Sequence, residues 1–225
     1  MKLQHVNALI TGGSQGLGKV IAEQFLREGA RVVICARSEA ELFAARDELA
    51  GKHSARNVLA KPCDVSEEKQ VNELVAFALR EWGALHVLVL NAGVYGPMGP
   101  TELVPLDEWR RALDINLLGV LLPCRAVIPH FKKAGRGKII VVSGGGATNP
   151  LPNISAYAAS KAAVVRLAET LAEELRPFHV DVNAIAPGAL ATRLVDQVLA
   201  AGPEKVGAAF YQKNKQWKET GATPP

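Results

Sequence analysis

The chain has 225 residues, of which 48% are hydrophobic, and its formal net charge is +4 at pH 7. This length fits one domain with a full core, so we expect a single domain over residues 1–225. Lys and Arg are scattered rather than grouped, no apolar run reaches the ~18 residues of a membrane span, and residues 1–10 lack a signal peptide's layout. We therefore expect a cytoplasmic protein with no nucleic-acid partner and no membrane partner.

The cysteines favour a reduced protein without a metal. Cys35, Cys63 and Cys124 are odd in number, lie far apart, and each sits in or beside an apolar run. Disulfides and a zinc site are poor interpretations of that pattern. We expect buried thiols and no metal site.

Short β-branched runs alternate with longer helical patterns along the chain. The runs cover residues 7–11, 31–36, 57–63, 85–92, 138–143 and 180–186, and the helical patterns cover about 17–28, 39–52, 67–81, 105–133 and 155–176. The runs are nearly continuous in apolar residues, as strands covered on both faces must be. The alternation predicts an α/β fold with a doubly wound, Rossmann-like parallel sheet of six strands, whose ligands bind beyond the carboxyl ends of the strands.

A glycine-rich turn follows the first run. Gly12, Gly16 and Gly18 in "TGGSQGLG" open an amphipathic helix with the spacing G-x-x-x-G-x-G. Residues without a Cβ permit a tight turn and let a pyrophosphate approach backbone N–H groups at a helix start. A plain strand-to-helix turn is the alternative, but the order strand, turn, helix, strand favours a phosphate site. Its candidate residues are Gly12, Ser14, Gln15, Gly16, Leu17 and Gly18.

The end of the second run bears on the choice of coenzyme. Ala36 stands where a carboxylate would bind the 2'-hydroxyl of NAD, and Arg37 follows it. A guanidinium can donate charge-assisted hydrogen bonds to the 2'-phosphate of NADP. The alternative is a solvated Arg at a strand end. We expect NADP as the cofactor, with NAD possible.

The helical pattern at 155–176 begins with two ionisable residues on one face. Tyr157 and Lys161 are four residues apart, and the same face continues with the apolar residues Val164, Ala168, Leu171 and Leu175. A phenol with a pKa of ~10 becomes useful for proton transfer near neutral pH when a nearby cation favours its phenolate. An ordinary amphipathic helix whose Lys reaches outward is the alternative.

Several motifs occur in one order along the chain, and together they resemble the short-chain dehydrogenase/reductase family. They are "TGGSQGLG", "CDV" at 63–65, "NAG" at 91–93, "DIN" at 114–116, Tyr157 with Lys161, and "NAIAPGALAT" at 183–192. The similarity runs from about residue 5 to about 215. It implies a reversible hydride transfer between nicotinamide and a small carbonyl or alcohol substrate, without a metal.

The resemblance also implies roles for individual residues. Tyr157 would be the general acid/base, Lys161 would bind the nicotinamide ribose and lower the pKa of Tyr157, and Asn116 would hold a water linking Lys161 to solvent. The remaining cofactor contacts would come from Asp64 and Val65 at the adenine, Asn91, Ala92 and Gly93 at the ribose region, and Pro187, Gly188 and Thr192 at the nicotinamide.

Charge that develops on a carbonyl oxygen calls for a second hydrogen-bond donor beside the Tyr. The family's Ser stands thirteen residues before the Tyr, where this chain has Gly144, and Ser143 stands fourteen before it. Either the glycine-rich loop carries one extra residue and Ser143 fills the role, or another group such as Ser155 or Thr148 does. The strand-end context of "KIIVVS" favours Ser143.

Two other functions compete with the oxidoreductase. One is a sugar-nucleotide epimerase or dehydratase, although relatives of that kind carry a larger substrate domain. The other is a non-catalytic dinucleotide sensor. Residues 94–104 and a lid segment at 190–217 should line the substrate pocket.

The family's last helix and seventh strand have no counterpart before the "ATPP" that ends the sequence, so we expect an exposed sixth strand. We also expect a homo-oligomer formed through the helices near 105–133 and 155–176.

Overall fold

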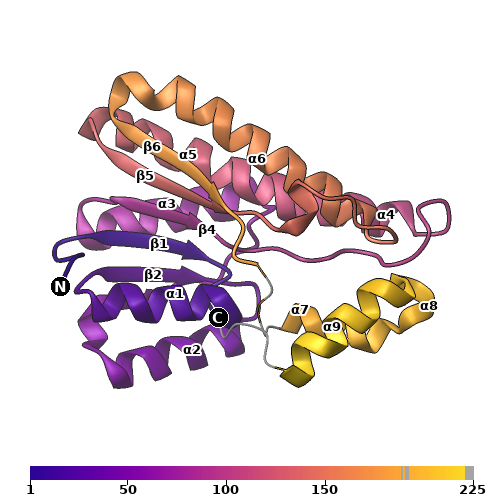
Figure 1. Cartoon of the computed structure of the whole chain (residues 1–225). Helices are drawn as coiled ribbons and strands as arrows, with labels where there is room; N and C mark the ends of the chain where they lie inside the picture. Colours follow the sequence, from indigo (N-terminus) through magenta and orange to yellow (C-terminus); the bar gives the residue numbers. More distant parts are fainter. Residues whose placement is uncertain (189, 191–192, 221–225) are drawn as a thin grey trace.

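The computed structural model describes residues 1–188, 190 and 193–220 (Figure 1). The strands are β1 (Asn7–Thr11), β2 (Arg31–Cys35), β3 (Val58–Ala60), β4 (Val87–Leu90), β5 (Gly137–Val142) and β6 (Val180–Ile185). The helices are α1 (Gly16–Arg27), α2 (Glu39–Lys52), α3 (Glu68–Trp82), α4 (Leu106–Leu113), α5 (Gly119–Ala134), α6 (Ser155–Leu175), α7 (Arg193–Ala201), α8 (Pro203–Val206) and α9 (Ala208–Thr220). Four single-turn or π segments join them, η1 (Ala55–Asn57), η2 (Asp114–Leu118), η3 (Gly145–Ala147) and η4 (Arg176–Phe178).

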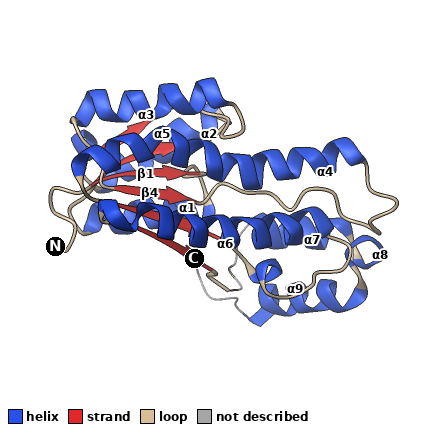
Figure 2. Cartoon of the chain, turned by 90° about the horizontal axis from the view of Figure 1, so that it is seen from above, coloured by secondary structure: helices blue, strands red, loops and turns tan. Residues whose placement is uncertain are grey.

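The strands form one parallel sheet in the order β3-β2-β1-β4-β5-β6. The order reverses between β1 and β4, so the carboxyl ends of these two strands border the crevice in which such sheets bind ligands. Helices α1 and α2 pack on one face, and α3, α5 and α6 pack on the other (Figures 1 and 2). The six-stranded, doubly wound fold expected from the sequence is confirmed.

The core lies in two layers, one on each face of the sheet. Alternate residues of the central strands enter opposite layers: Leu9 and Leu88 face α3 and α5, whereas Ile10 and Val89 face α1 and α2. This is the alternation that a strand's two-residue period produces. Cys35, Cys63 and Cys124 are buried with free thiols, as the sequence predicted.

The third strand is shorter than the apolar run from which it was predicted. It ends at Ala60, and Pro62 lies two residues beyond it. β3 is the edge strand of the sheet, where a proline is tolerated, so Pro62 does not end the contact with β2. The backbone N–H groups of Lys61 and Cys63 still donate to β2 and the residue after it, at 3.2 and 3.0 Å.

The long helical pattern at 105–133 is interrupted. Between α4 and α5, η2 (Asp114–Leu118) is π-helical, a local widening that frequently marks functional sites. Taken as one helix, Leu106–Ala134 is long and apolar enough to cross a membrane, although the sequence contains no continuous apolar run of that length. Its α5 part packs against α3 and β5, as a core helix does.

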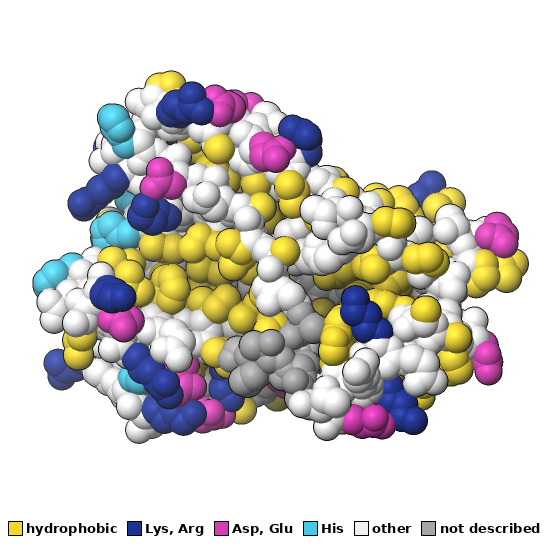
Figure 3. Space-filling model, viewed as in Figure 1, with side chains coloured by type: hydrophobic (Ala, Val, Ile, Leu, Met, Phe, Trp, Pro, Cys, Tyr) yellow, Lys and Arg dark blue, Asp and Glu magenta, His cyan; other side chains and the backbone are white. Residues whose placement is uncertain are grey.

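Strand β6 lies at the edge of the sheet. Val180 and Val182 are buried beneath α6, whereas Ile185 is 42% exposed. Apolar side chains are in view over this part of the sheet, where neither α1 nor α2 covers it (Figure 3). The exposed sixth strand expected from the sequence is therefore present. The end of the chain, Thr223 to Pro225, lies outside the described residues.

Candidate active site

The glycine turn after β1 is held from behind by the end of β4. The Thr11 hydroxyl accepts hydrogen bonds from the backbone N–H groups of Asn91 and Ala92, at 3.0 and 3.1 Å. The Asn91 side-chain amide donates to the carbonyl oxygens of Thr11 and Gly12, both at 3.1 Å. Gly12 has a φ of 65°, a value that favours glycine. These bonds fix the turn beside the crevice.

The first turn of α1 lies against Gly12. A Cβ on Gly18 would overlap the carbonyl oxygen of Gly12 and come within 2.5 Å of Asn91 Nδ2. Only glycine therefore permits this close packing of helix and turn, which is one of the glycine roles in dinucleotide-binding turns.

We expect Gly18→Ala to lower the free energy of unfolding by ~2 kcal/mol or more, because the added methyl group meets backbone atoms rather than a flexible side chain. Gly51 is a matched control near the end of α2, since a Cβ there would meet nothing within 4 Å. Gly51→Ala should be neutral or slightly stabilising. Urea unfolding of both variants measures the difference, and an equal effect of the two would contradict the close packing at Gly18.

The predicted adenine end of the site contains a carboxylate that is already held in place. Asp64, after β3, accepts hydrogen bonds from the Ser66 backbone N–H at 3.0 Å and the Ser66 hydroxyl at 2.6 Å. Arg111 of α4 donates to the other carboxylate oxygen at 2.5 Å and to the Ser66 hydroxyl at 2.7 Å. Against the opposing effect of burial, these bonds hold the pKa of Asp64 below its usual value. Arg37, after β2, is exposed.

Two of the predicted catalytic residues, Asn116 and Lys161, meet at Gly93. A Cβ on Gly93 would lie 3.2 Å from Asn116 Oδ1 and 3.4 Å from Lys161 Nζ. Asn116, on the π-helical segment, accepts from the Val94 backbone N–H at 2.8 Å and donates to the Val94 carbonyl oxygen at 2.8 Å. The structure thus brings together the end of β4, the π-helical segment and α6.

Tyr157 and Lys161 begin a buried face of α6, as predicted. Their exposed fractions are 9% and 4%, and Val164, Ala168, Leu171 and Leu175 continue this face into the core. The Lys161 ammonium donates to the Val142 carbonyl oxygen at 2.9 Å and lies 5.6 Å from the centre of the Tyr157 ring. An ammonium has three N–H groups, so this position leaves Lys161 able to donate to a ribose.

Burial is the main influence on the pKa values of Tyr157 and Lys161. Burial raises the pKa of the Tyr157 phenol and lowers the pKa of Lys161 to about 8. Removing a group from water disfavours its charged form. The expectation that Lys161 lowers the pKa of Tyr157 stays a prediction, because the direction of the shift given by burial does not measure the effect of the cation.

Ser143 faces a different partner from the one predicted for it. Its Oγ donates to the Lys161 carbonyl oxygen at 3.4 Å, and the side chain is buried. The residue that faces the Tyr157 hydroxyl is Gly144, where a Cβ would overlap the phenolic oxygen. The assignment of Ser143 as a donor to substrate stays a prediction, and its observed hydrogen bond does not support that role.

The lid segment predicted at 190–217 is helical over most of its length, comprising α7, α8 and most of α9. Phe210 of α9 contacts Tyr95, which follows β4, with ring centres 6.4 Å apart and rings nearly perpendicular. Tyr95 in turn contacts Tyr157, with ring centres 4.7 Å apart. Three aromatic rings therefore connect the lid to α6.

The other predicted nicotinamide contacts lie between β6 and the lid. Pro187 is half-buried and Gly188 is exposed, with a φ of 79°. Thr192, the third residue of that prediction, lies outside the described residues. No group of three or more His, Cys, Asp or Glu side chains is placed to hold a metal ion within residues 1–188, 190 and 193–220.

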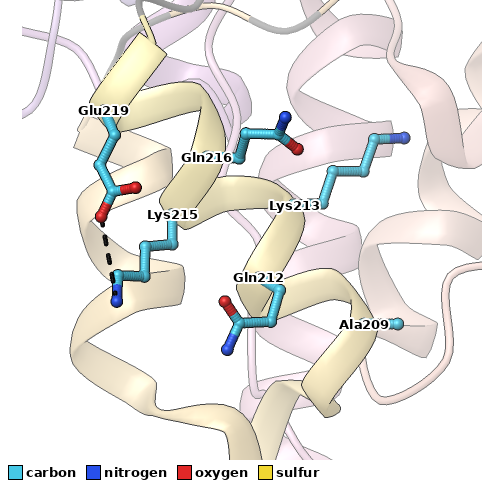
Figure 4. A pocket seen from close by; sticks show the side chains of 6 residues that line it. All are labelled: Ala209, Gln212, Lys213, Lys215, Gln216 and Glu219. Carbon is cyan, nitrogen blue, oxygen red and sulfur yellow. Dashed lines mark ion pairs between the residues drawn. The ribbon is translucent and has the colours of Figure 1, made fainter.

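Two surface hollows lie away from Tyr157. A hollow of about 500 Å³ is lined by α9 alone, where Lys215 and Glu219 form an ion pair (Figure 4). A second, of about 320 Å³, lies between α4 and the segment after β4 and includes Val94 and Arg111. Neither contains a predicted catalytic residue, so the site is defined by the side chains around Gly93 and not by these hollows.

The sequence analysis did not single out three residues that shape the site. Thr11 braces the glycine turn, Arg111 holds Asp64, and Tyr95 contacts Tyr157. Tyr95 fell within the segment expected to line the pocket, so its aromatic character next to "NAG" was an available signal. Arg111 could not be recognised from the sequence, because 47 residues separate it from Asp64.

The donor set fits a dinucleotide. The predicted phosphate turn, Arg37, Asp64, the end of β4 and Lys161 all lie at the carboxyl ends of strands, on the side where such sheets bind ligands. The glycine turn leaves no space for a Cβ at Gly18, and Lys161 lies beside Gly93. A bound nicotinamide coenzyme would supply or accept a hydride at this edge.

Known proteins are similar to this chain in both sequence and fold. The model of the family described as short chain dehydrogenase matches residues 6–202. Glucose 1-dehydrogenase of Gluconobacter oxydans (strain 621H) is 40% identical over 185 residues, which are 82% of this chain and 69% of the relative.

Two crystal structures resemble the fold over most of its length. Levodione reductase has a TM-score of 0.86 and 31% identity, with 92% of this chain and 81% of that one covered. The 3-ketoacyl-(acyl-carrier-protein) reductase from Brucella melitensis, complexed with NADH, has a TM-score of 0.80 and 37% identity, with 85% and 78% covered. The chain therefore belongs to the short-chain dehydrogenase/reductase family and is an NAD(P)-dependent oxidoreductase of CH–OH or C=O groups.

Proposed function

We propose that the chain catalyses NADP-dependent hydride transfer to and from a small, partly apolar carbonyl or alcohol substrate, with Tyr157 as the general acid/base. The observation that supports this proposal is that Lys161 and Asn116 meet beside Gly93, after β4, and that the Lys161 ammonium lies 5.6 Å from the centre of the Tyr157 ring.

Each residue has a defined part in the proposed reaction. Tyr157 donates its phenolic proton to the oxygen of the substrate as that oxygen gains charge, and it takes the proton back in the oxidative direction. Lys161 holds the ribose of the coenzyme and keeps positive charge next to the phenol. Asn116 keeps Val94 and Gly93 in place through its two hydrogen bonds to the Val94 backbone.

A screen of carbonyl compounds with NADPH tests the proposal. The decrease in NADPH absorbance would be followed for aliphatic ketones, cyclic diketones, sugars and 3-ketoacyl thioesters, and for the matching alcohols with NADP⁺. We expect turnover of at least one small carbonyl class. If NADPH binds but is consumed with none of the panel, the chain is a dinucleotide-binding protein and not an enzyme of this class.

The preference for NADP rests on Arg37. Its guanidinium is exposed at the end of β2, and Ala36 leaves no carboxylate to repel a 2'-phosphate. We expect Arg37→Ala to weaken NADPH binding by ~1 to 3 kcal/mol and to change NADH binding little, because only NADPH carries the phosphate. Fluorescence titration of both coenzymes measures this difference.

A nearby arginine supplies the control for that measurement. Arg56, in η1, is exposed and lies between α2 and β3 rather than after a strand. Arg56→Ala removes the same charge from the protein, so it reports any effect of net charge alone. Equal losses of NADPH and NADH affinity in Arg37→Ala would mean that Arg37 stabilises the site without reading the phosphate.

The remaining proposals concern assembly and location. We propose a homo-oligomer through α4, α5 and α6, since Leu106 and Leu118 on that long helix are 59% and 38% exposed. Exposed apolar side chains of this size are found at many protein interfaces. We also propose a cytoplasmic location, with no nucleic acid or membrane as partner.

A further inference from the structure

The residue that faces the Tyr157 hydroxyl has no side chain. A Cβ on Gly144 would overlap the phenolic oxygen of Tyr157, so position 144 borders the place where Tyr157 would meet a substrate. A glycine there offers space but no side-chain donor. The proposed reaction nevertheless develops negative charge on the substrate oxygen, which a second donor stabilises.

The nearby serine and threonine hydroxyls make hydrogen bonds with groups other than Tyr157. Ser143 donates to the Lys161 carbonyl oxygen at 3.4 Å from a buried position. Ser155 accepts a hydrogen bond from Trp109 Nε1 at 3.1 Å, and Thr148 accepts one from Asn149 at 3.1 Å on the exposed loop. None of these three contacts the Tyr157 phenol in the described part of the chain.

Tyr95 is in direct contact with Tyr157. The two ring centres are 4.7 Å apart with the rings inclined at 60°, and Phe210 covers Tyr95 from the lid at 6.4 Å. Tyr95 is half-buried, and within the described ranges the structure shows ring contacts for its side chain but no hydrogen bond. Burial first, and then the proximity of Tyr157, raise the pKa of the Tyr95 phenol, so that this hydroxyl keeps its proton.

We propose that Tyr95 is a second catalytic residue, whose hydroxyl donates a hydrogen bond to the substrate oxygen that Tyr157 protonates. Tyr95 thereby supplies the donor that Gly144 lacks. This inference rests on the proposed hydride transfer and adds a residue to it.

The two phenols then have different tasks. As a hydride adds to the carbonyl carbon, the π electrons of the C=O bond move to oxygen, and Tyr157 transfers its proton to that oxygen and takes another from solvent. Tyr95 only donates a hydrogen bond and keeps its proton throughout. A phenol that resists ionisation suits the second task, because a phenolate could not donate.

Tyr95 also contacts the lid, through Phe210. Phe210 lies on α9, so Tyr95 is held between the catalytic helix and the lid. This contact therefore helps to fix the position of the Tyr95 ring beside Tyr157.

Tyr95→Phe tests the proposal, because it keeps the ring contacts with Tyr157 and Phe210 and removes only the hydroxyl. We expect kcat for carbonyl reduction to fall by about 100-fold, as loss of one oxyanion donor does in other enzymes. Coenzyme affinity and the midpoint of thermal unfolding should stay at the wild-type values, since no coenzyme contact and no packing contact is lost.

Two further variants complete the comparison. Tyr211→Phe removes a lid tyrosine's hydroxyl that has no ring contact with Tyr157 or Tyr95, and its kcat should stay at least about tenfold above that of Tyr95→Phe. Ser143→Ala should also cost less than Tyr95→Phe. If Ser143→Ala causes the larger loss and Tyr95→Phe is near wild type, Ser143 is the donor and the inference is wrong.

A measurement without substrate separates this inference from the proposed function. The free protein would be titrated with base while ultraviolet absorbance records the formation of phenolates. The step that is missing in Tyr157→Phe belongs to Tyr157. The structure shows only ring contact between the two tyrosines while both are neutral. We expect the Tyr157 phenolate, once formed, to accept a hydrogen bond from the Tyr95 hydroxyl, so removing that hydroxyl should raise the pKa of this step.

The outcomes are distinct. An unchanged Tyr157 step in Tyr95→Phe would overturn the placement of the Tyr95 hydroxyl, whether or not a carbonyl is turned over. Loss of turnover in Tyr157→Phe together with full activity in Tyr95→Phe would leave the proposed function intact and refute only the role of Tyr95. Full activity in Tyr157→Phe would instead refute the acid/base assignment itself.

Discussion

Replacing Tyr157 with Phe is expected to lower kcat by ~100-fold or more in both reaction directions, because a positioned general acid/base contributes at least that factor. The ring would still fill its place against Tyr95, where the two ring centres are 4.7 Å apart. Only the titrating hydroxyl beside Gly144 would be missing. The affinity for NADPH should therefore change little, and stopped-flow or steady-state assays with an active carbonyl would measure the loss.

Folding and coenzyme binding serve as the internal controls for that variant. A thermal midpoint and an NADPH dissociation constant close to the wild-type values would assign the loss to chemistry. If Tyr157→Phe kept more than about a tenth of kcat, the general acid/base would have to be another group.

Lys161→Met should abolish measurable turnover and at the same time stabilise the fold. Lys161 is 4% exposed, and burial lowers its pKa to about 8, so the folded protein bears the cost of a buried charge at neutral pH. Methionine has a similar length and no charge. After allowance for the lost hydrogen bond to Val142, we expect the free energy of unfolding at pH 7 to rise by ~1 to 2 kcal/mol.

The pH dependence of stability provides a second signature of Lys161. Its ordinary pKa is 10.5, so between pH 8 and 10.5 the unfolded chain binds more protons than the folded one at this position. The contribution of Lys161 therefore makes the wild type more stable as pH rises through this window, and below pH 8 the full cost is present. Lys161→Met should lack this contribution.

Lys133 provides the matched control, because it is an exposed lysine at the end of α5. Lys133→Met should leave both the stability at pH 7 and its pH dependence close to wild type. Urea unfolding at pH 7, 8, 9 and 10 would compare the three proteins. A destabilised Lys161→Met protein at pH 7 would show that Lys161 contributes more through its hydrogen bond than it costs through burial.

The sequence was sufficient for the sheet because its signal is local and redundant. Each strand is a continuous apolar run between helical patterns, and the carboxyl ends of parallel strands must share one edge. The same reasoning brought the glycine turn, Asn91 and Lys161 to one site. Strand ends were less well predicted: β3 ends at Ala60, whereas the apolar run from which it was predicted extends to residue 63.

The hydrogen-bond partners of the site residues could not be predicted from the sequence, because the spacing of residues along the chain does not determine which side chains meet. Ser143 and Gly144 are neighbours, yet only the structure shows that Gly144 faces the Tyr157 phenol and that Ser143 bonds to Lys161. Arg111 reaches Asp64 across 47 residues of sequence. The pKa of Tyr157 is likewise raised by burial, which is a tertiary property.

The transfer of a labelled hydride tests the central claim most directly. The protein would be incubated with an accepted carbonyl and NADPH deuterated at both C4 positions, and the alcohol would be analysed by mass spectrometry. Our account predicts one deuterium on the carbinol carbon for each NADPH consumed, and almost none with Tyr157→Phe because reduction stops. Alcohol without deuterium, or NADPH that binds and remains unconsumed across the carbonyl panel, would contradict it.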